Sequence, residues 1–277
     1  MNEIVLNERE KAEQSIKEHS LGAFPFETLT RVAKYYIDVE KISKREAREK
    51  LAAYLLSCDP RASVPKWDDT LDRAVSKATR YPLIDIPYVG VTQPEMDIID
   101  SLKTSAEKRF AFTLLCLAKY HTLINNESNY WVKEEAKHIM KLANINMTVE
   151  RQDMMYHSLY KDGLIALPKS IDNLSCQVLF VREDGDMILK IDDFRNLGWQ
   201  YEAYKGGSFY RCTSCGKYVK ANKSNVGRPA KYCPECAKKI HAIQQVESNR
   251  RMRAAAREQS VHTFFQSDDK NYASEQA

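Results

Sequence analysis

Two Cys-x-x-Cys pairs near the C-terminal end constrain this chain more than any other feature of its sequence. The first pair is Cys212 and Cys215, the second is Cys233 and Cys236, and a loop rich in Lys and Arg separates them. Each pair can point two thiolates at one ion, and two pairs complete the tetrahedral four-sulfur shell that Zn²⁺ prefers in structural sites. The sequence therefore predicts one structural Zn²⁺ held by these four cysteines, in a shell that leaves no open position for a substrate.

Other uses of these cysteines stay open at the level of sequence. The pairs could form two disulfides or a redox centre, although no thioredoxin-like βαβ pattern surrounds either pair. His241 follows Cys236 closely enough to replace one cysteine in a Cys₃His shell. The remaining cysteines lie in apolar segments, where a free cysteine usually behaves as a small buried hydrophobe, and we assign them no function: Cys58, Cys116 and Cys176.

Positive charge is concentrated around the paired cysteines. Residues 211–257 contain 12 Lys or Arg residues and only two acidic ones, whereas the whole chain has a formal net charge of +4. A segment this basic attracts a polyanion, and nucleic acid, with DNA as the first candidate, is the partner that it favours. The alternative is a solvated basic face that only keeps the segment soluble.

Part of this charge falls on a predicted helix. The sequence after Cys236 contains no Gly or Pro and is compatible with a helix to about Gln259. We expect the apolar part of one helical face, with Ile243 and Val246, to be docked, and the basic part to project toward nucleic acid. The candidate contact residues on this helix are Lys239, Arg250, Arg251, Arg253 and Arg257.

Composition limits the class of protein. A chain of 277 residues with 43% hydrophobic content can bury a real core, and its length suggests two or three units. The first residues show no basic segment followed by an apolar one, and no run of 18 uncharged apolar residues occurs. We therefore expect no membrane partner and a cytoplasmic location, in a bacterial host cell.

The fold class predicted from periodicity is mainly α, beginning with a helical N-terminal domain over residues 1–91. Apolar residues recur at spacings of three and four between Leu29 and Ile37, as one buried helical face requires. Ser43 and Glu46 form a capping box at the start of the next helix, and Thr92 and Glu95 form another.

The middle domain, residues 92–205, has the order of elements typical of a winged helix-turn-helix (α+β). A long helix is followed by a short strand, a second helix over 133–143, a tight turn at 144–147, a third helix over 149–162 and a hairpin. A second hairpin, with its turn at 182–186, is predicted to lead into the strand Met187–Ile191. The alternative for the whole region is a generic helical bundle with a terminal hairpin.

The third helix of this region is the candidate reader of base edges. Arg151 and Gln152 lie near its N-terminal end, where a DNA-reading helix places its contact residues. Glu150 and Asp153 flank them, and the predicted wing offers only Lys169 as a cation. A protein-binding or purely structural winged helix is the open alternative.

The cysteine segment resembles a known kind of module. Cys212-Thr213-Ser214-Cys215-Gly216-Lys217, the approach Gly227-Arg228-Pro229-Ala230-Lys231-Tyr232-Cys233, and a second pair that runs into a basic helix are similar to treble-clef or zinc-ribbon fingers. Such fingers occur in uncharacterised bacteriophage and mobile-element proteins of Gram-positive bacteria. The resemblance covers residues 210–250 and implies a zinc-binding module with a basic helix, which we place at 206–259. The polar and acidic composition of the last residues separately predicts a disordered tail at 260–277.

The sequence contains no signature of catalysis. It has no Gly-rich phosphate loop, no His-Glu-x-x-His and no Gly-x-Ser-x-Gly motif, so we expect that the protein is not an enzyme. The leading hypothesis is a zinc-binding, nucleic-acid-binding protein of a phage or mobile element that acts in transcription regulation or replication. The alternative is a protein-binding adaptor or phage anti-host factor in which the zinc finger is a structural scaffold.

Overall fold

The structure, a computed structural model, describes residues 4–168, 175–221 and 230–274. It is mainly helical, as predicted, and its strands form three small antiparallel sheets. The chain divides into two compact units, residues 1–207 and residues 208–277, which we describe separately. Among the described helices, none combines the length and the apolar composition needed to cross a lipid bilayer.

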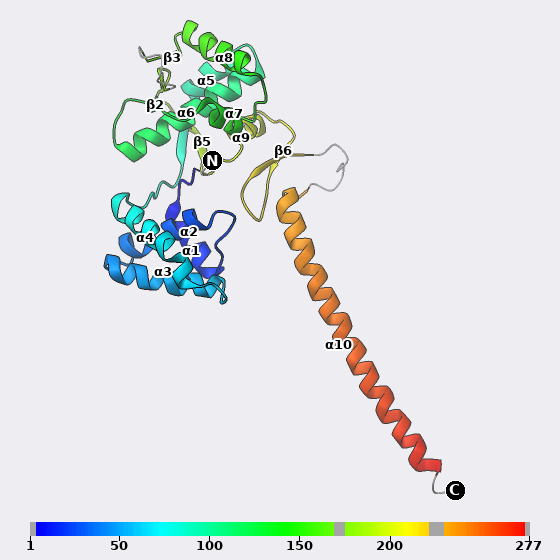
Figure 1. Ribbon diagram of the computed structural model, residues 1–277. Coiled ribbons are helices and arrows are strands. Elements are labelled where there is room, and N and C mark those ends of the chain that lie inside the picture. The colour runs from blue at the N-terminus through cyan, green and yellow to red at the C-terminus, as the bar shows by residue number, and fades with distance from the viewer. Residues whose placement is uncertain (1–3, 169–174, 222–229, 275–277) are drawn as a thin grey trace. The chain divides into compact units, whose positions relative to one another are not determined.

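The first unit begins with four helices that share one hydrophobic core (Figure 1). The predicted capping box at Ser43 is present, because the Ser43 hydroxyl accepts from the backbone N–H of Glu46 and the Glu46 carboxylate accepts from that of Ser43. The apolar stripe predicted between Leu29 and Ile37 lies in this core, in which Leu29, Leu51 and Leu71 are fully buried. The helices are α1 Glu8–Lys17, α2 Pro25–Asp38, α3 Lys44–Cys58 and α4 Val64–Arg80.

A second core of the same unit is built around one buried helix. Helix α6 buries residues on every side, including Phe110, Phe112 and Leu115, so its surroundings must cover it completely. Helix α6 is covered by buried apolar residues of the strands and helices between residues 89 and 201, and by Leu6 near the start of the chain. The helices of this part are α5 Gln93–Ser101, α6 Ser105–Asn125, α7 Ala136–Leu142, α8 Val149–Lys161 and α9 Leu197–Tyr204.

A three-stranded sheet accompanies these helices. Its strands are β2 Trp131–Val132, β3 Ile165–Ala166 and β4 Cys176–Val178, in the spatial order β2-β4-β3. Trp131 lies opposite Gln177, and Ile165 lies opposite Val178, so both outer strands are antiparallel to β4. Helix α8 begins after Thr148, in agreement with the helix predicted over 149–162, and is followed by Gly163 in the left-handed region (φ 70°).

One predicted hairpin is wrong. Strand β5, Met187–Ile191, does not pair with the strand that precedes it in sequence; it pairs with β1, Val89–Thr92, nearly 100 residues earlier. The pairing sets Val89 opposite Ile191, and both side chains are fully buried in the second core. Burial of these apolar residues against α6 therefore outweighs the local turn preference of Asp184-Gly185.

Glu95 joins several of these elements at a fully buried position. Its carboxylate accepts from the backbone N–H groups of Thr92 and Arg182, both at 2.9 Å, and from Lys119 Nζ at 2.7 Å. A buried carboxylate is tolerated only when it is paired and hydrogen-bonded, and here both conditions are met. The capping box predicted at Thr92 thus also links β1, α6 and the segment that precedes β5.

The second unit is a hairpin followed by one long helix. Strands β6 Phe209–Arg211 and β7 Tyr218–Lys220 pair in antiparallel fashion, and α10 covers Pro234–Ser274. The helix continues past its expected end near Gln259 and includes residues 260–274, which belong to the range 260–277 that the sequence predicts as a disordered tail. No Gly or Pro interrupts this range, so no local signal ends the helix there.

Candidate metal centre

The first cysteine pair lies on the turn of the β6–β7 hairpin. Cys212 directly follows β6, and its backbone N–H donates to the carbonyl oxygen of Lys217 across the turn (2.9 Å). Gly216 has φ 77°, a left-handed conformation that side chains disfavour, and its N–H donates to the Cys212 carbonyl oxygen (2.8 Å). This glycine-dependent turn brings Cys215 back toward Cys212.

The second pair lies at the start of α10. Cys233 immediately precedes the helix, and its carbonyl oxygen accepts from the Ala237 N–H (2.8 Å), so the first helical turn carries Cys236 round to the same side. Thr213 connects the two pairs, because its N–H and its hydroxyl both donate to the Lys231 carbonyl oxygen, at 2.9 and 3.1 Å. The hairpin turn and the helix start are therefore held against each other by the chain itself.

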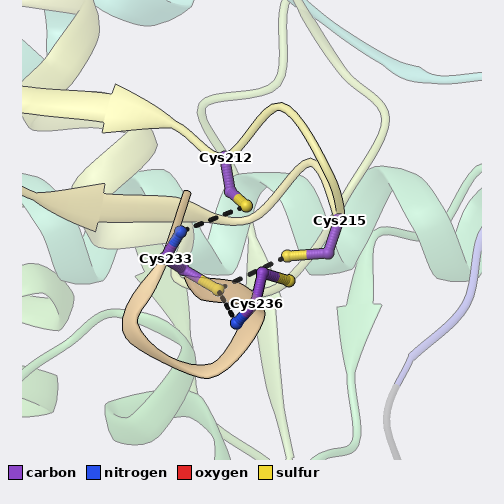
Figure 2. A group of neighbouring side chains, drawn as sticks. All are labelled: Cys212, Cys215, Cys233 and Cys236. Carbon is purple, nitrogen blue, oxygen red and sulfur yellow. Dashed lines mark hydrogen bonds between the residues drawn. The ribbon is translucent and has the colours of Figure 1, made fainter. Parts of the chain in front are cut away.

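The four sulfur atoms form one cluster (Figure 2). All lie within 4.8 Å of one another, and Cys215 Sγ is 3.8 Å from Cys233 Sγ. A disulfide requires an S–S distance of about 2.05 Å, whereas the edge of a tetrahedron with Zn–S distances of about 2.3 Å measures about 3.8 Å. The spacing of the sulfurs therefore fits a metal ion and does not fit disulfide bonds.

Backbone N–H groups also point at the sulfurs. The N–H of Cys233 donates to Cys212 Sγ (3.2 Å), and the N–H of Cys236 donates to Cys233 Sγ (3.4 Å). Such donors stabilise thiolates and are the usual surroundings of metal-bound sulfur. The residues present thus fit Zn²⁺, which would hold the hairpin and the helix together.

The pKa values of two of the thiols, Cys212 and Cys215, are shifted in opposite directions. Burial opposes ionisation of Cys212, but three backbone N–H groups outweigh it and lower the pKa of this thiol to about 6. Burial and the neighbouring sulfurs raise the pKa of Cys215 to about 12. A divalent cation compensates this crowding of negative charge, because it favours the thiolate form of every ligand.

His241 and the other buried cysteines lie away from the sulfur cluster. His241 is exposed and is not part of the sulfur cluster, so the four cysteines are the only group of this kind among the described residues. Cys116 and Cys176 are buried in the second core, and burial raises the pKa of both thiols, as expected for inert core cysteines.

The predicted basic stripe lies on the exposed surface of α10. Lys239, Arg250, Arg251 and Arg253 are all exposed; the side chain of Arg257 lies outside the described part. The expected docking of the apolar half of this stripe is wrong, because Ile243 and Val246 are 58% and 68% exposed. No described element of this unit covers this part of α10, so both its apolar and its basic residues are exposed.

The two residues predicted to read bases differ in their surroundings. Arg151 is exposed near the start of α8, whereas Gln152 is half-buried and its side-chain amide donates to the Met147 carbonyl oxygen (3.1 Å). Gln152 therefore supports the turn before its helix. Lys169, at the predicted wing, lies outside the described residues.

Comparisons with known proteins leave the family open. No family of known proteins and no solved structure matches the chain. Arginine–tRNA ligases of Vibrio campbellii and Vibrio vulnificus are 30% identical to it over 104 residues. The match covers 35% of this chain and 15% of those ligases, so the chain spans only a small part of the length of these curated proteins.

Proposed function

We propose that this chain is a zinc-stabilised nucleic-acid-binding protein. In this proposal the sulfur cluster holds one Zn²⁺, the second unit binds phosphates, and helix α8 of the first unit contributes to base recognition. A role in transcription regulation or replication of a phage or mobile element is part of the proposal. It is supported by the resemblance of the cysteine segment to fingers of such proteins.

The observation that carries the proposal is a row of exposed cations on the described part of α10 that form no ion pair. Among the described residues of α10, five cations have side chains that form no ion pair and no hydrogen bond: Lys238, Lys239, Arg250, Arg251 and Arg253. Some cations of the first unit, by contrast, form ion pairs, as in Lys34–Glu8, Lys119–Glu95 and Lys205–Asp100. Exposed, unneutralised cations along one helix are what a phosphate backbone binds, with release of its counterions.

The arrangement around α8 supports its part in the proposal. The order α6, β2, α7, α8, β3, β4, together with the sheet order β2-β4-β3, is compatible with a winged helix, whose third helix enters the major groove of DNA. The partial likeness to arginine–tRNA ligases makes a tRNA a further natural probe, since the name of those proteins identifies their substrate.

A protein-binding adaptor is the second candidate, and one observation favours it. Helix α8 exposes three large apolar side chains, Val149, Met154 and Tyr160, which are 66%, 60% and 54% exposed. Apolar side chains grouped on one helix are more typical of protein contacts than of phosphate contacts. Under this hypothesis the zinc module would serve as a scaffold.

A fluorescence-anisotropy titration of the full chain against labelled duplex DNA, single-stranded DNA and tRNA tests the proposal. We expect binding that weakens with salt, and a triple variant, Arg250→Ala with Arg251→Ala and Arg253→Ala, should reduce the salt slope by up to about three phosphate contacts.

A matched control removes the same charge from the first unit. Lys17→Ala, Lys66→Ala and Arg80→Ala change three exposed cations there and should leave the salt slope unchanged. If neither the intact chain nor the control binds any of the three probes at low salt, the nucleic-acid function is rejected and the adaptor hypothesis takes its place.

A further inference from the structure

Strand register gives the β6–β7 hairpin two different faces. Tyr210 and Cys212 are two residues apart and therefore share one face. On that face the Tyr210 hydroxyl donates to the Tyr232 carbonyl oxygen (3.0 Å), next to Cys233. This face is thus turned toward the metal centre and the start of α10.

The opposite face combines aromatic rings and cations. Phe209 pairs directly with Lys220, and Arg211 pairs directly with Tyr218, so all four side chains lie on the side turned away from the cysteines. Each ring has a cation as its cross-strand neighbour, which leaves the two rings diagonal to each other. Lys220 and Arg211 are exposed, although Arg211 Nε also donates to the Gly216 carbonyl oxygen (3.1 Å), and the two rings are half-buried.

We propose that this hairpin face is a stacking platform for single-stranded nucleic acid. Its rings would stack on unpaired bases, and its cations would contact the phosphates between them. The inference rests on the proposed function and adds to it the class of nucleic acid that the second unit prefers.

The geometry of the face selects single strands over duplexes. Diagonal cross-strand residues lie about 7–8 Å apart, more than twice the rise of about 3.4 Å between stacked bases of a duplex strand. Two bases on this platform must therefore be separated from each other. In a duplex the base faces are already occupied by their neighbours, so only an unpaired strand can offer them.

The cations of the hairpin match this ligand. Lys217 and Lys231, close to the hairpin in sequence, are further basic residues, and Glu235 is the only acidic residue between Ser208 and Val246. Because an alternation of rings and positive charge is complementary to alternating bases and phosphates, the face recognises the strand without requiring a particular sequence.

The test uses the full chain with its metal and two labelled probes. The first is an oligo-dT strand of about 16 nucleotides, a length at the upper end of the site sizes known for single-strand-binding folds, and the second is a duplex of equal length. We expect Tyr218→Leu and Phe209→Leu each to weaken binding of oligo-dT by about 5- to 100-fold, the loss of one stacked base. Duplex binding should stay within about twofold of the intact chain, because the cations remain. Tyr232→Leu removes an exposed ring outside this face and should change neither affinity.

Two further measurements keep the test decisive. The zinc content of each variant shows whether its cysteine module is still folded. If a Leu variant has lost its zinc, Tyr218→Trp replaces it in the test, because it retains an aromatic ring; its fluorescence should be quenched by oligo-dT but not by the duplex. If the intact chain binds both probes but the Leu variants bind oligo-dT normally, or Tyr218→Trp shows no quenching, the platform is rejected and the proposed function stands. If the intact chain does not bind oligo-dT, the platform is rejected; the proposed function is rejected with it only if duplex DNA and tRNA also fail to bind.

Discussion

The side-chain amide of Asn144 donates to the side-chain oxygen of Asn196 at 3.0 Å, although the two residues are 52 positions apart. Both residues adopt left-handed backbone conformations, with φ 55° and 58°. The Asn144 side-chain oxygen also accepts from the backbone N–H of Trp199 in the first turn of α9 (3.1 Å). The turn between α7 and α8 is therefore joined to the start of α9 by one asparagine, which fixes the direction in which α8 leaves the turn.

Replacing Asn144 by glycine tests this connection. Asn144→Gly keeps the left-handed backbone accessible but removes both hydrogen bonds, so we expect a loss of about 1–3 kcal/mol in the free energy of unfolding. Urea titration followed by tryptophan fluorescence measures it, since Trp67, Trp131 and Trp199 all lie in the first unit. Asn146→Gly, at an exposed position of the same turn, is the control; an equal loss in both variants would contradict the role of the amide.

Gly198 should be the least replaceable glycine of the first unit. A Cβ at this position would lie 1.9 Å from the carbonyl oxygen of Ala143, which is main chain and cannot rotate away. We expect Gly198→Ala to cost about 3 kcal/mol or more, because α9 must move off the end of α7. Gly163→Ala, where a Cβ meets nothing but φ is 70°, should cost only about 1–2 kcal/mol, and the same urea titration ranks the two variants.

One zinc ion per chain is the prediction for the metal centre. Elemental analysis of protein purified without added metal should give about one zinc, and Cys233→Ser should lose it, since three sulfurs and a hydroxyl bind Zn²⁺ more weakly. Removal of the metal by a chelator should unfold the hairpin while the tryptophan signal of the first unit stays unchanged. Cys58→Ser is the control and should retain the metal; protein with paired cysteines and no zinc would contradict the assignment.

Helix α8 offers a matched pair of cations for the question of base recognition. If its N-terminal end enters a major groove, Arg151→Ala should cost about 1–3 kcal/mol on a preferred site and much less on random DNA. Lys161→Ala removes another exposed cation, from the other end of the helix, and should affect all sequences alike. Site selection with the intact protein comes first, and an undiminished preference in Arg151→Ala would remove α8 from the reading surface.

Stability of the first unit should fall in acid partly through Glu107. Burial opposes ionisation of this carboxylate, but hydrogen bonds from the Ser158 hydroxyl (2.9 Å) and from Thr104 outweigh it and lower its pKa. A depressed pKa in the folded state contributes stability above the ordinary Glu pKa of about 4.3, and this contribution is lost as the pH falls through the folded-state value.

The urea midpoint of the intact chain should accordingly decrease from pH 6 toward pH 3 more steeply than that of Glu107→Gln. Ser158→Ala removes one of the lowering hydrogen bonds and should give an intermediate slope. Identical pH profiles of the intact chain and Glu107→Gln would show that another carboxylate dominates the acid response.

Local signals in the sequence determined much of this protein. The capping boxes at Ser43 and Thr92 and the helix start at Thr148 depend on residues at most four positions apart, and all are present in the structure. The metal centre was predictable for the same reason, because each Cys-x-x-Cys pair is a short turn whose geometry is set by its own backbone. What sequence could not supply was the distance between the two pairs, which depends on the hairpin and on the Thr213–Lys231 contacts.

Only the tertiary structure decided which distant segments meet. The partner of β5 is β1 because burying Val89 and Ile191 together against α6 is worth more than closing the nearer hairpin, and periodicity within either strand cannot express that competition. The aromatic and basic face of β6–β7 was hidden for a similar reason, since it exists only once Phe209 is in register with Lys220. Local preferences are set by neighbours in the chain, whereas pairing and register are set by the total apolar surface that the folded chain removes from water.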